Sequence, residues 1–245
     1  MSITELIFCI SIGMCLGSFA SVLIYRIPRN INLLVPGSHC PCCNNKLRAI
    51  HLVPIFSYAF LRGNCAFCSS KISRLYPVNE IFITAMVAIT TYHAGPYSID
   101  GWLTITLILC LYVQAVIDFK ILSLSTYLSA IIGLLGFALN YLHFFTSIID
   151  SLAGLILGYC SLWLINYIYK KIKGTDGIGS GDYLLLGAVG GVFGSSSLGI
   201  ILLSSSIISI GLHFFTRTIH GERIPLGTGI ALSSIIFLVL IILNK

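Results

Sequence analysis

Charged side chains are scarce in this sequence of 245 residues. Only 9% of the residues are charged, whereas 57% are hydrophobic. An ordinary soluble domain is roughly a quarter charged, so this composition excludes a water-soluble globule and a disordered acidic or basic tail. The net charge of +6 is a thin surplus over a long chain, and we expect no nucleic-acid partner.

Familiar catalytic motifs are absent as well. The sequence contains no G-x-S-x-G elbow, no H-E-x-x-H pair and no P-loop. These motifs identify serine hydrolases, zinc metalloproteases and P-loop nucleotide enzymes, so those chemistries find no support in the sequence. Any catalysis must come from the few polar side chains that the chain retains.

Long apolar runs make up most of the chain instead. A helix needs about 20 apolar residues to cross a bilayer. Runs of roughly that length lie at 3–25, 78–95, 102–117, 124–142, 150–168, 183–199, 199–216 and 226–244. We therefore predict an all-α, polytopic membrane protein with about eight transmembrane helices in the lipid bilayer. The small-xxx-small pairs Gly13/Gly17 and Gly154/Gly158 are interpreted as points of close helix packing.

One polar stretch interrupts these runs, and it suggests a division into three parts. We expect a first transmembrane helix at 1–25, a small cytoplasmic loop domain at 26–76 and a membrane-embedded domain at 77–245. The first run is not expected to be a cleaved signal peptide, because its basic residues follow the apolar run instead of preceding it.

The basic residues indicate how the chain crosses the membrane. If the polar stretch 26–75 is cytoplasmic, the loops near 119–123, 169–181 and 217–225 are cytoplasmic too. These segments hold 13 of the 14 basic residues, all except Lys245. Since basic residues collect on the cytoplasmic side, we predict that both termini lie on the opposite, periplasmic side.

Four of the nine cysteines have the spacing of a metal site. Two C-x-x-C pairs are separated by 21 residues: Cys40, Cys43, Cys65 and Cys68. This spacing is near that of the paired turns in zinc ribbons, and a reducing cytosol disfavours disulfides. We predict a structural zinc ion that folds a loop too short and polar to build its own core. Cys42 in place of Cys43, His39 as a competing ligand, and free or redox-active thiols remain alternatives.

Two of the eight acidic residues lie where a carboxylate is costly. Asp118 ends the apolar run at 102–117, and Asp182 opens the run at 183–199, 64 residues later. By the predicted topology both lie at the cytoplasmic membrane face, where ionisable residues usually mark function. Each could instead be a helix-end residue that reaches water, with Asp182 as an N-cap. Because both lie at equal depth and Asp182 follows a G-x-G-x-G segment, we favour a catalytic pair.

The remaining acids have structural interpretations. Asp150, near an external helix end, and Asp176, in the glycine-rich loop, are expected to be solvated. Glu80 is expected to cap the helix that it opens, because an acid favours the positive N-terminal end. Glu222 is expected to form a surface pair with Arg223.

A pair of buried aspartates predicts a specific chemistry. Two carboxyl groups in one low-dielectric site cannot both ionise, so they are expected to share one proton. The ionised member would take a proton from water while the protonated member polarises a peptide carbonyl. The glycines before Asp182 would let the backbone approach an extended substrate. The pair therefore predicts amide hydrolysis without a covalent intermediate.

Several segments together resemble the type IV prepilin peptidases. Residues 17–28 (GSFASVLIYRIP) resemble the opening segment of that family, and residues 76–80 (YPVNE) resemble the start of its second span. The two C-x-x-C pairs match its cytoplasmic zinc loop. Residues 116–120 (VIDFK) resemble its first aspartate motif, and residues 179–182 (GSGD) its second.

The resemblance implies a bacterial inner-membrane aspartic endopeptidase with Asp118 and Asp182 as its catalytic pair. Such enzymes remove the basic leader of type IV prepilins, or of pilin-like type II secretion proteins, at the cytoplasmic membrane face. Many members also methylate the new N-terminal amine with S-adenosylmethionine. Because Ala49-Ile50-His51-Leu52 replaces a segment of the family's zinc loop, methylation stays open, and no cofactor-binding residue is assigned.

Two other functions remain open from the sequence. A polytopic cation or proton transporter would bind its ion with the same carboxylates and use the zinc loop as a gate. A more distant G-x-G-D protease would cut substrate helices within the membrane. The confinement of both aspartates to one membrane face favours the leader peptidase over the transporter.

Overall fold

The computed structural model describes residues 2–35, 37–220 and 223–244, with the backbone alone for residues 215–220. Over these ranges the regular secondary structure is helical, apart from two isolated β-bridges in the polar loop. The all-α prediction is therefore confirmed for this part of the chain. Glu222, which we expected to pair with Arg223, lies outside the described residues.

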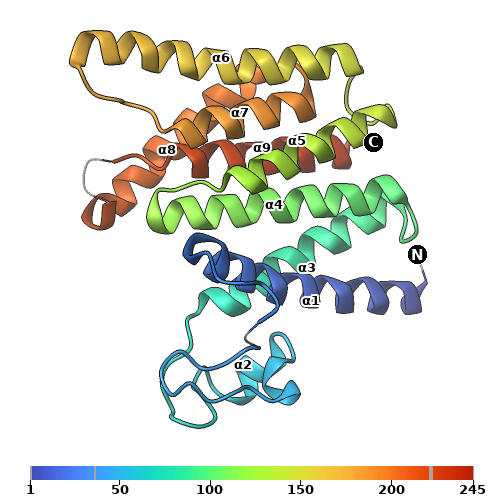
Figure 1. The fold of residues 1–245 in the computed structure, drawn as a ribbon. Coiled ribbons are helices and arrows are strands. Elements are labelled where there is room, and N and C mark those ends of the chain that lie inside the picture. Colours follow the sequence, from blue (N-terminus) through green and yellow to red (C-terminus); the bar gives the residue numbers. More distant parts are fainter. Residues whose placement is uncertain (1, 36, 221–222, 245) are drawn as a thin grey trace. The chain divides into compact units, whose positions relative to one another are not determined.

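The chain folds into two compact units, Met1–Ser98 and Ile99–Lys245. The first contains α1 (Ile3–Arg26), the 3-10 helices η1 (Ile27–Arg29) and η2 (Ala49–Leu52), α2 (Phe56–Phe60) and α3 (Leu75–Ala94). The second contains α4 (Ile99–Ile121), α5 (Thr126–Tyr141), α6 (Ile148–Lys173), α7 (Ser180–Phe193), α8 (Leu198–His220) and α9 (Leu226–Leu243) (Figure 1). The boundary after Ser98 differs from the sequence division at 76/77, because α3 packs on α1.

Four helices of the described chain are long and apolar enough to cross a membrane. They are α1 with its 3-10 extension, α4, α6 and α9, whereas α5, α7 and the Leu198–Phe214 part of α8 are apolar but shorter. The side chains of Ile156, Leu164 and Ile165 on α6 are each more than half exposed. A soluble monomer rarely exposes such contiguous apolar surface. The structure thus supports a polytopic membrane protein with four membrane-length helices, where the sequence predicted about eight.

In the first unit, α1 and α3 run antiparallel. Gly13 of α1 faces Thr84 of α3, and Gly17 faces Glu80, so the contacts move toward the start of α3 as α1 proceeds. A Cβ atom at Gly13 would lie 2.9 Å from the Thr84 Cα atom, which leaves room for glycine alone. Both ends of the polar loop therefore emerge at the same end of this helix pair.

In the second unit, glycines set the contact between the antiparallel helices α6 and α7. A Cβ atom at Gly158 would lie 2.6 Å from the carbonyl oxygen of Leu186, and Gly154 lies directly against Gly190. The interpretation of the Gly154/Gly158 spacing as a close packing point is confirmed. The backbones of α6 and α7 touch because neither helix presents a side chain there.

Replacing Gly158 by alanine is expected to destabilise the protein by about 1–3 kcal/mol, the usual effect of overpacking a tight contact. Thermal unfolding of the detergent-solubilised protein measures the change. Gly199→Ala on α8 is the matched control, because no atom lies within 4 Å of its Cβ position. Equal unfolding temperatures for the two variants would contradict this packing.

One end of the second unit gathers the start or end of three helices. Leu124, between α4 and α5, packs against Gly181 at the start of α7 and against Gly227 at the start of α9. A Cβ atom at Gly227 would lie 2.7 Å from Leu124 Cδ1. The C-terminal end of α4 therefore meets the N-terminal ends of α7 and α9, and this meeting point positions the catalytic candidates.

The N-terminal end of α6 is held by Asp150, which lies in the first turn of that helix. Its carboxylate accepts a hydrogen bond from the Thr146 hydroxyl at 2.8 Å and from the Ser195 N–H at 3.2 Å. The Ser195 hydroxyl donates to it as well. Asp150, which we expected only to be solvated, thus links the α5–α6 and α7–α8 loops.

Candidate metal and catalytic sites

Two turns of the polar loop share one backbone design. In each turn the N–H of the first cysteine donates to the residue five positions on, Cys40 to the Asn45 oxygen at 3.0 Å and Cys65 to the Ser70 oxygen at 2.8 Å. The residue after the second cysteine has a φ of 56° in both turns. This repeated design turns the two cysteines of each C-x-x-C pair to the same side.

The two turns bring four thiols together. Their ligand atoms all lie within 4.8 Å of one another, and they belong to Cys40, Cys43, Cys65 and Cys68. Four sulfurs at about 2.3 Å from a tetrahedral zinc ion would be about 3.8 Å apart, and the Cys40 and Cys68 sulfurs are 3.9 Å apart. The cluster therefore fits a zinc ion. It includes Cys43 and not the exposed Cys42, while His39 Nδ1 lies 3.0 Å from the Gly37 oxygen instead.

The turns also favour the ionised form of two of these thiols. The N–H groups of Cys43 and Cys42 are directed at Cys40 and lower the pKa of its thiol to about 6. The Ser70 hydroxyl lowers the pKa of the Cys68 thiol. Since the thiolate is the form that binds metal, the surroundings of these two thiols suit a metal ligand. Burial and the neighbouring Cys68 and Cys40 thiols raise the pKa of the Cys43 thiol to about 11.

Asp118 lies near the C-terminal end of α4 and is only 5% exposed. One helical turn earlier, the fully buried Gln114 accepts the Ser125 N–H at 3.0 Å and donates to the Ser129 hydroxyl at 3.0 Å. Gln114 thereby fixes the start of α5 against α4. Asp118 Oδ2 accepts the N–H of Thr228 in α9 at 2.6 Å. The carboxylate is held inside the unit instead of reaching water at the helix end.

Asp182 lies in the first turn of α7, directly after the glycine-rich segment. Its N–H donates to the Gly179 oxygen at 3.1 Å, and its Oδ2 atom lies 3.1 Å from the position that a Gly179 Cβ would occupy. The N-cap of α7 is Gly179, with no side-chain cap, so the N-cap interpretation of Asp182 is wrong. Leu124 packs against Gly181, next to Asp182, and against Gly227, next to the Thr228 that bonds Asp118, so the two aspartates lie at the same end of the second unit.

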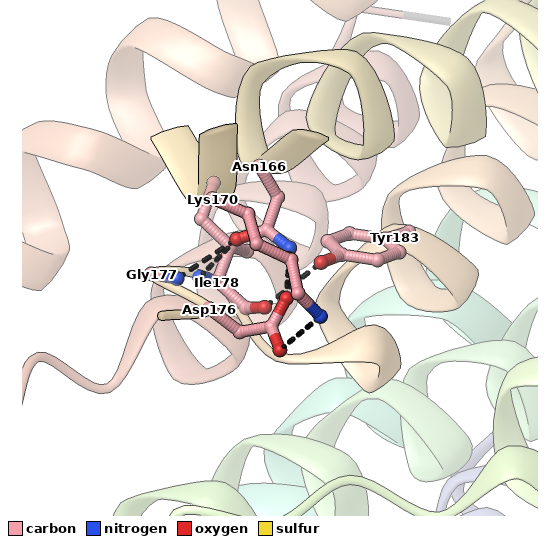
Figure 2. Close-up of polar contacts among 6 residues, drawn as sticks. All are labelled: Asn166, Lys170, Asp176, Gly177, Ile178 and Tyr183. Carbon is pink, nitrogen blue, oxygen red and sulfur yellow. Dashed lines mark hydrogen bonds and ion pairs between the residues drawn. The ribbon is translucent and has the colours of Figure 1, made fainter. Parts of the chain in front are cut away.

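A polar latch made by Asn166 holds the glycine-rich loop to α6. Asn166 Oδ1 accepts the N–H groups of Gly177 at 2.8 Å and Ile178 at 3.0 Å, and its Nδ2 donates to Asp176 at 2.9 Å (Figure 2). The Tyr183 hydroxyl donates to the Ile178 oxygen at 2.8 Å. The latch therefore fixes the backbone that leads into Asp182.

Asp176 is part of this latch and not merely solvated. Lys170 Nζ lies 2.9 Å from its Oδ2 atom. The Lys170 ammonium and the Asn166 amide hold the pKa of the Asp176 carboxyl below its usual range. Both partners of the ion pair are more than half exposed, so we expect the pair to contribute little beside the buried amide of Asn166.

Replacing Asn166 by alanine is expected to release the loop. The substitution removes both hydrogen bonds to the amides of Gly177 and Ile178. At about 1 kcal/mol for each, a loop that opens as one unit loses about 2 kcal/mol, which corresponds to a roughly thirtyfold faster hydrogen exchange. Exchange of these two amides, followed by mass spectrometry, measures the effect. Lys170→Gln is the control and should leave exchange unchanged. Unchanged exchange in Asn166→Ala would contradict the latch.

The first unit contains a cavity of about 670 Å³ between α1, the start of α3 and the cysteine loop. Arg26 and Glu80 line it, and they are only 7% and 6% exposed. His51 also lines it, and its buried Nδ1 atom has no hydrogen-bond partner among the described residues. A concave site of this size with a few convergent polar groups is typical of a small-molecule site.

Glu80 does not cap α3, contrary to our expectation. It is the sixth residue of that helix, and its Oε2 atom accepts the N–H of Ile55 at 2.6 Å. Ile55 has a φ of 63°, and the Phe56 N–H bonds the Pro54 oxygen at 2.6 Å. This closes a γ-turn that strains a β-branched residue. Backbone strain of this kind clusters at ligand sites. Here the strained residue is Ile55, which Glu80 holds beside the cavity.

Two residues near the candidate aspartates are not predicted from the sequence. Asn166 left a signal, because an amide within an apolar helix needs a polar partner. Thr228 left none, since it follows Asp118 by 110 residues and lies in an ordinary run of small residues. Only the packing of α9 on α4 brings Thr228 to the carboxylate.

The chain is similar to known proteins over nearly its whole length. Residues 11–94 match the Bacterial Peptidase A24 N-terminal domain, and residues 105–214 match the Type IV leader peptidase family. The "Prepilin leader peptidase/N-methyltransferase" of Neisseria gonorrhoeae is 31% identical, covering 91% of this chain and 86% of the relative. The proteins of the same name from Aeromonas hydrophila and Pseudomonas aeruginosa are 30% and 27% identical, covering 90% and 91% of this chain and 86% of each relative. No solved structure matches the chain significantly. This chain belongs to the type IV leader peptidase family.

Proposed function

We propose that this protein is a membrane-embedded aspartic endopeptidase that removes the leader peptide of type IV prepilins or of pilin-like type II secretion proteins. One observation carries the proposal: Asp118, from the end of α4, and Asp182, from the start of α7, lie at the same end of the second unit, where Leu124 packs against Gly181 and Gly227. The names of its relatives support the same activity. They give no support to the cation transporter considered from the sequence.

The two carboxyl groups would divide the work of hydrolysis. Repulsion between two charges in a low-dielectric site leaves one proton on the pair. The ionised group takes a proton from the attacking water, and the protonated group polarises the scissile carbonyl. The exposed backbone of Gly179, in the loop that the Asn166 latch holds, offers a surface on which an extended leader can lie. The neighbouring glycines Gly177 and Gly181 are instead covered by Tyr169 and Leu124.

We also propose that the catalytic end faces the cytoplasm of a bacterial inner membrane, with both termini in the periplasm. In this arrangement α3, α5, α7 and α8 cross the membrane beside the four membrane-length helices. The contacts of Leu124 support it, because they bring together the end of α4, which carries Lys120, and the start of α9, which follows the loop with Arg223. Basic residues mark the cytoplasmic side.

The four-cysteine cluster is proposed to hold a structural zinc ion. The donor set fits this ion, since four sulfurs lie at nearly the spacing that a tetrahedral site requires. Zinc would supply folding free energy to a loop that has little core of its own.

S-adenosylmethionine is the cofactor implied by the name of the relatives. The cavity of the first unit fits such a molecule in size, and the unpartnered Nδ1 of His51 offers it a polar contact. Arg26, His51 and Glu80 are the residues that would hold it. When bound, the cofactor supplies the methyl group for the new N-terminal amine of the pilin.

Mass spectrometry of a prepilin N-terminus tests both activities in one sample. Membranes that contain this protein are expected to yield a pilin cut just before its apolar helix, and heavier by one methyl group when S-adenosylmethionine is added. A cut within the apolar helix would favour the intramembrane protease instead. Uncut prepilin would contradict the proposed peptidase, and cut but unmethylated pilin would contradict the methyltransferase alone.

A further inference from the structure

Asp118 is held by a residue from the other end of the chain. Thr228, the third residue of α9, donates its N–H to Asp118 Oδ2 at 2.6 Å, and its hydroxyl lies 2.8 Å from the same oxygen. Thr228 is 3% exposed and Asp118 is 5% exposed. Two donors therefore converge on one buried carboxylate oxygen.

The position of Thr228 in the first turn of α9 also stabilises a negative charge on Asp118. The first amides of a helix have no acceptor within the helix and form the positive end of its dipole. The N-cap residue of α9, Pro225, makes no side-chain cap. Asp118 supplies the missing acceptor from α4, and the end of α9 in turn stabilises a negative charge on Asp118.

The two contacts also favour the ionised form of Asp118. A backbone N–H can only donate, so Asp118 Oδ2 must present a lone pair to Thr228. The Thr228 hydroxyl has one hydrogen and two acceptors in reach, Asp118 Oδ2 at 2.8 Å and the Ala115 oxygen at 3.2 Å, and the shorter contact is to the carboxylate. Hydrogen bonds to the charged form of an acid favour that form.

The helices around Asp118 carry few titratable side chains. Asp182 lies in the first turn of α7, at the same end of the second unit as Asp118. In the sequence of α9 there is no titratable side chain, and that of α5 holds only Tyr127 and Tyr141. On α4 itself, the next charged residue is Lys120. Two Thr228 donors converge on Asp118 Oδ2, and this contact makes the surroundings of the two carboxyl groups unequal.

We propose that Thr228 is a positioning residue that keeps Asp118 as the ionised member of the pair; this assignment rests on the proposed peptidase. Asp118 then takes a proton from the water whose oxygen bonds to the scissile carbon, and Asp182 gives its proton to the carbonyl oxygen. As the C–N bond breaks, the proton on Asp118 passes to the leaving nitrogen. The former carbonyl oxygen returns its proton to Asp182, so both groups end as they began.

The pH profile of prepilin cleavage by the full-length enzyme tests this assignment. Thr228→Val keeps the N–H and the shape but loses the hydroxyl, so the acid limb of kcat/KM is expected to move up by about one pH unit, a tenfold change in proton affinity. Thr228→Ser is the control and should retain the wild-type profile. Thr228→Pro removes both donors, and the first turn of a helix tolerates proline. The acid limb of kcat/KM for this variant should move to a higher pH than that for Thr228→Val.

Two outcomes would overturn the proposal. One is a Thr228→Val profile that coincides with that of wild type. The other is an equal loss of rate at every pH with an unmoved acid limb, since that indicates a merely structural role.

An infrared titration of the carboxyl bands tests the same assignment without cleavage. The Asp118 band is identified by its loss in Asp118→Asn, and it is expected to titrate at higher pH in Thr228→Val than in wild type or Thr228→Ser. If the wild-type protein cleaves no prepilin, the proposed function is wrong. The infrared titration then still tests whether Thr228 favours the ionised form of Asp118. An unshifted Asp118 band would overturn its role.

Discussion

Asp118→Asn and Asp182→Asn are each expected to reduce prepilin cleavage by roughly 100- to 10,000-fold, the range that a general acid or base contributes. An amide has nearly the shape of a carboxyl group but cannot accept the proton of water or supply one to a carbonyl. Asparagine at 118 can still accept the N–H of Thr228, so the contact between α4 and α9 should survive. Cleavage is measured in membranes that contain equal amounts of each variant.

Asp100→Asn is the matched control for this experiment. Asp100 belongs to the first turn of α4, the same helix that carries Asp118 at its other end. This variant should cleave as wild type does. Full activity in Asp118→Asn or Asp182→Asn, or a comparable loss in Asp100→Asn, would contradict the assignment of the catalytic pair.

Cys40→Ser and Cys65→Ser are each expected to abolish stoichiometric zinc binding and to unfold the polar loop. Both thiols are buried, with 6% and 7% of each residue exposed. Structural zinc contributes roughly 10–16 kcal/mol of apparent binding free energy in isolated zinc-finger peptides. A loop with little apolar core has no other contribution to its folding free energy that is large enough to replace zinc binding. Metal analysis of the purified protein and limited proteolysis of residues 26–75 measure the two effects.

Cys42→Ser separates the two ligand assignments that the sequence left open. Cys42 is exposed and lies outside the four-thiol cluster, so this variant should retain one zinc ion per chain. Loss of zinc in Cys42→Ser with retention in Cys43→Ser would reverse the assignment. Wild-type protein without zinc and with four freely titratable loop thiols would contradict the site itself.

Local spacing was sufficient to predict the helices and the cysteine cluster. The apolar runs predicted α1, α4, α6 and α9 because a membrane-length helix satisfies its own backbone and depends little on the rest of the fold. The C-x-x-C spacing predicted the cluster because each turn is closed by its own backbone hydrogen bonds.

The sequence was less informative wherever a side chain bonds a distant helix. Glu80 was expected to cap α3, but it bonds Ile55 in the loop. Asp150 was expected to be solvated, but it joins two loops. No motif or local spacing points to Thr228, since its partner Asp118 lies on α4. Such contacts depend on how helices pack, and spacing along the chain carries no record of that packing.

Asp118 and Asp182 are expected to act as one catalytic unit, and a comparison of single and double variants tests this most directly. Cleavage of purified prepilin by Asp118→Asn, Asp182→Asn and the double variant is measured side by side in detergent. Residues that act as a unit lose nearly all of their joint effect when either is removed, so the double variant should be no slower than the slower single variant. Losses that multiply in the double variant, or a single variant with wild-type cleavage, would contradict the account.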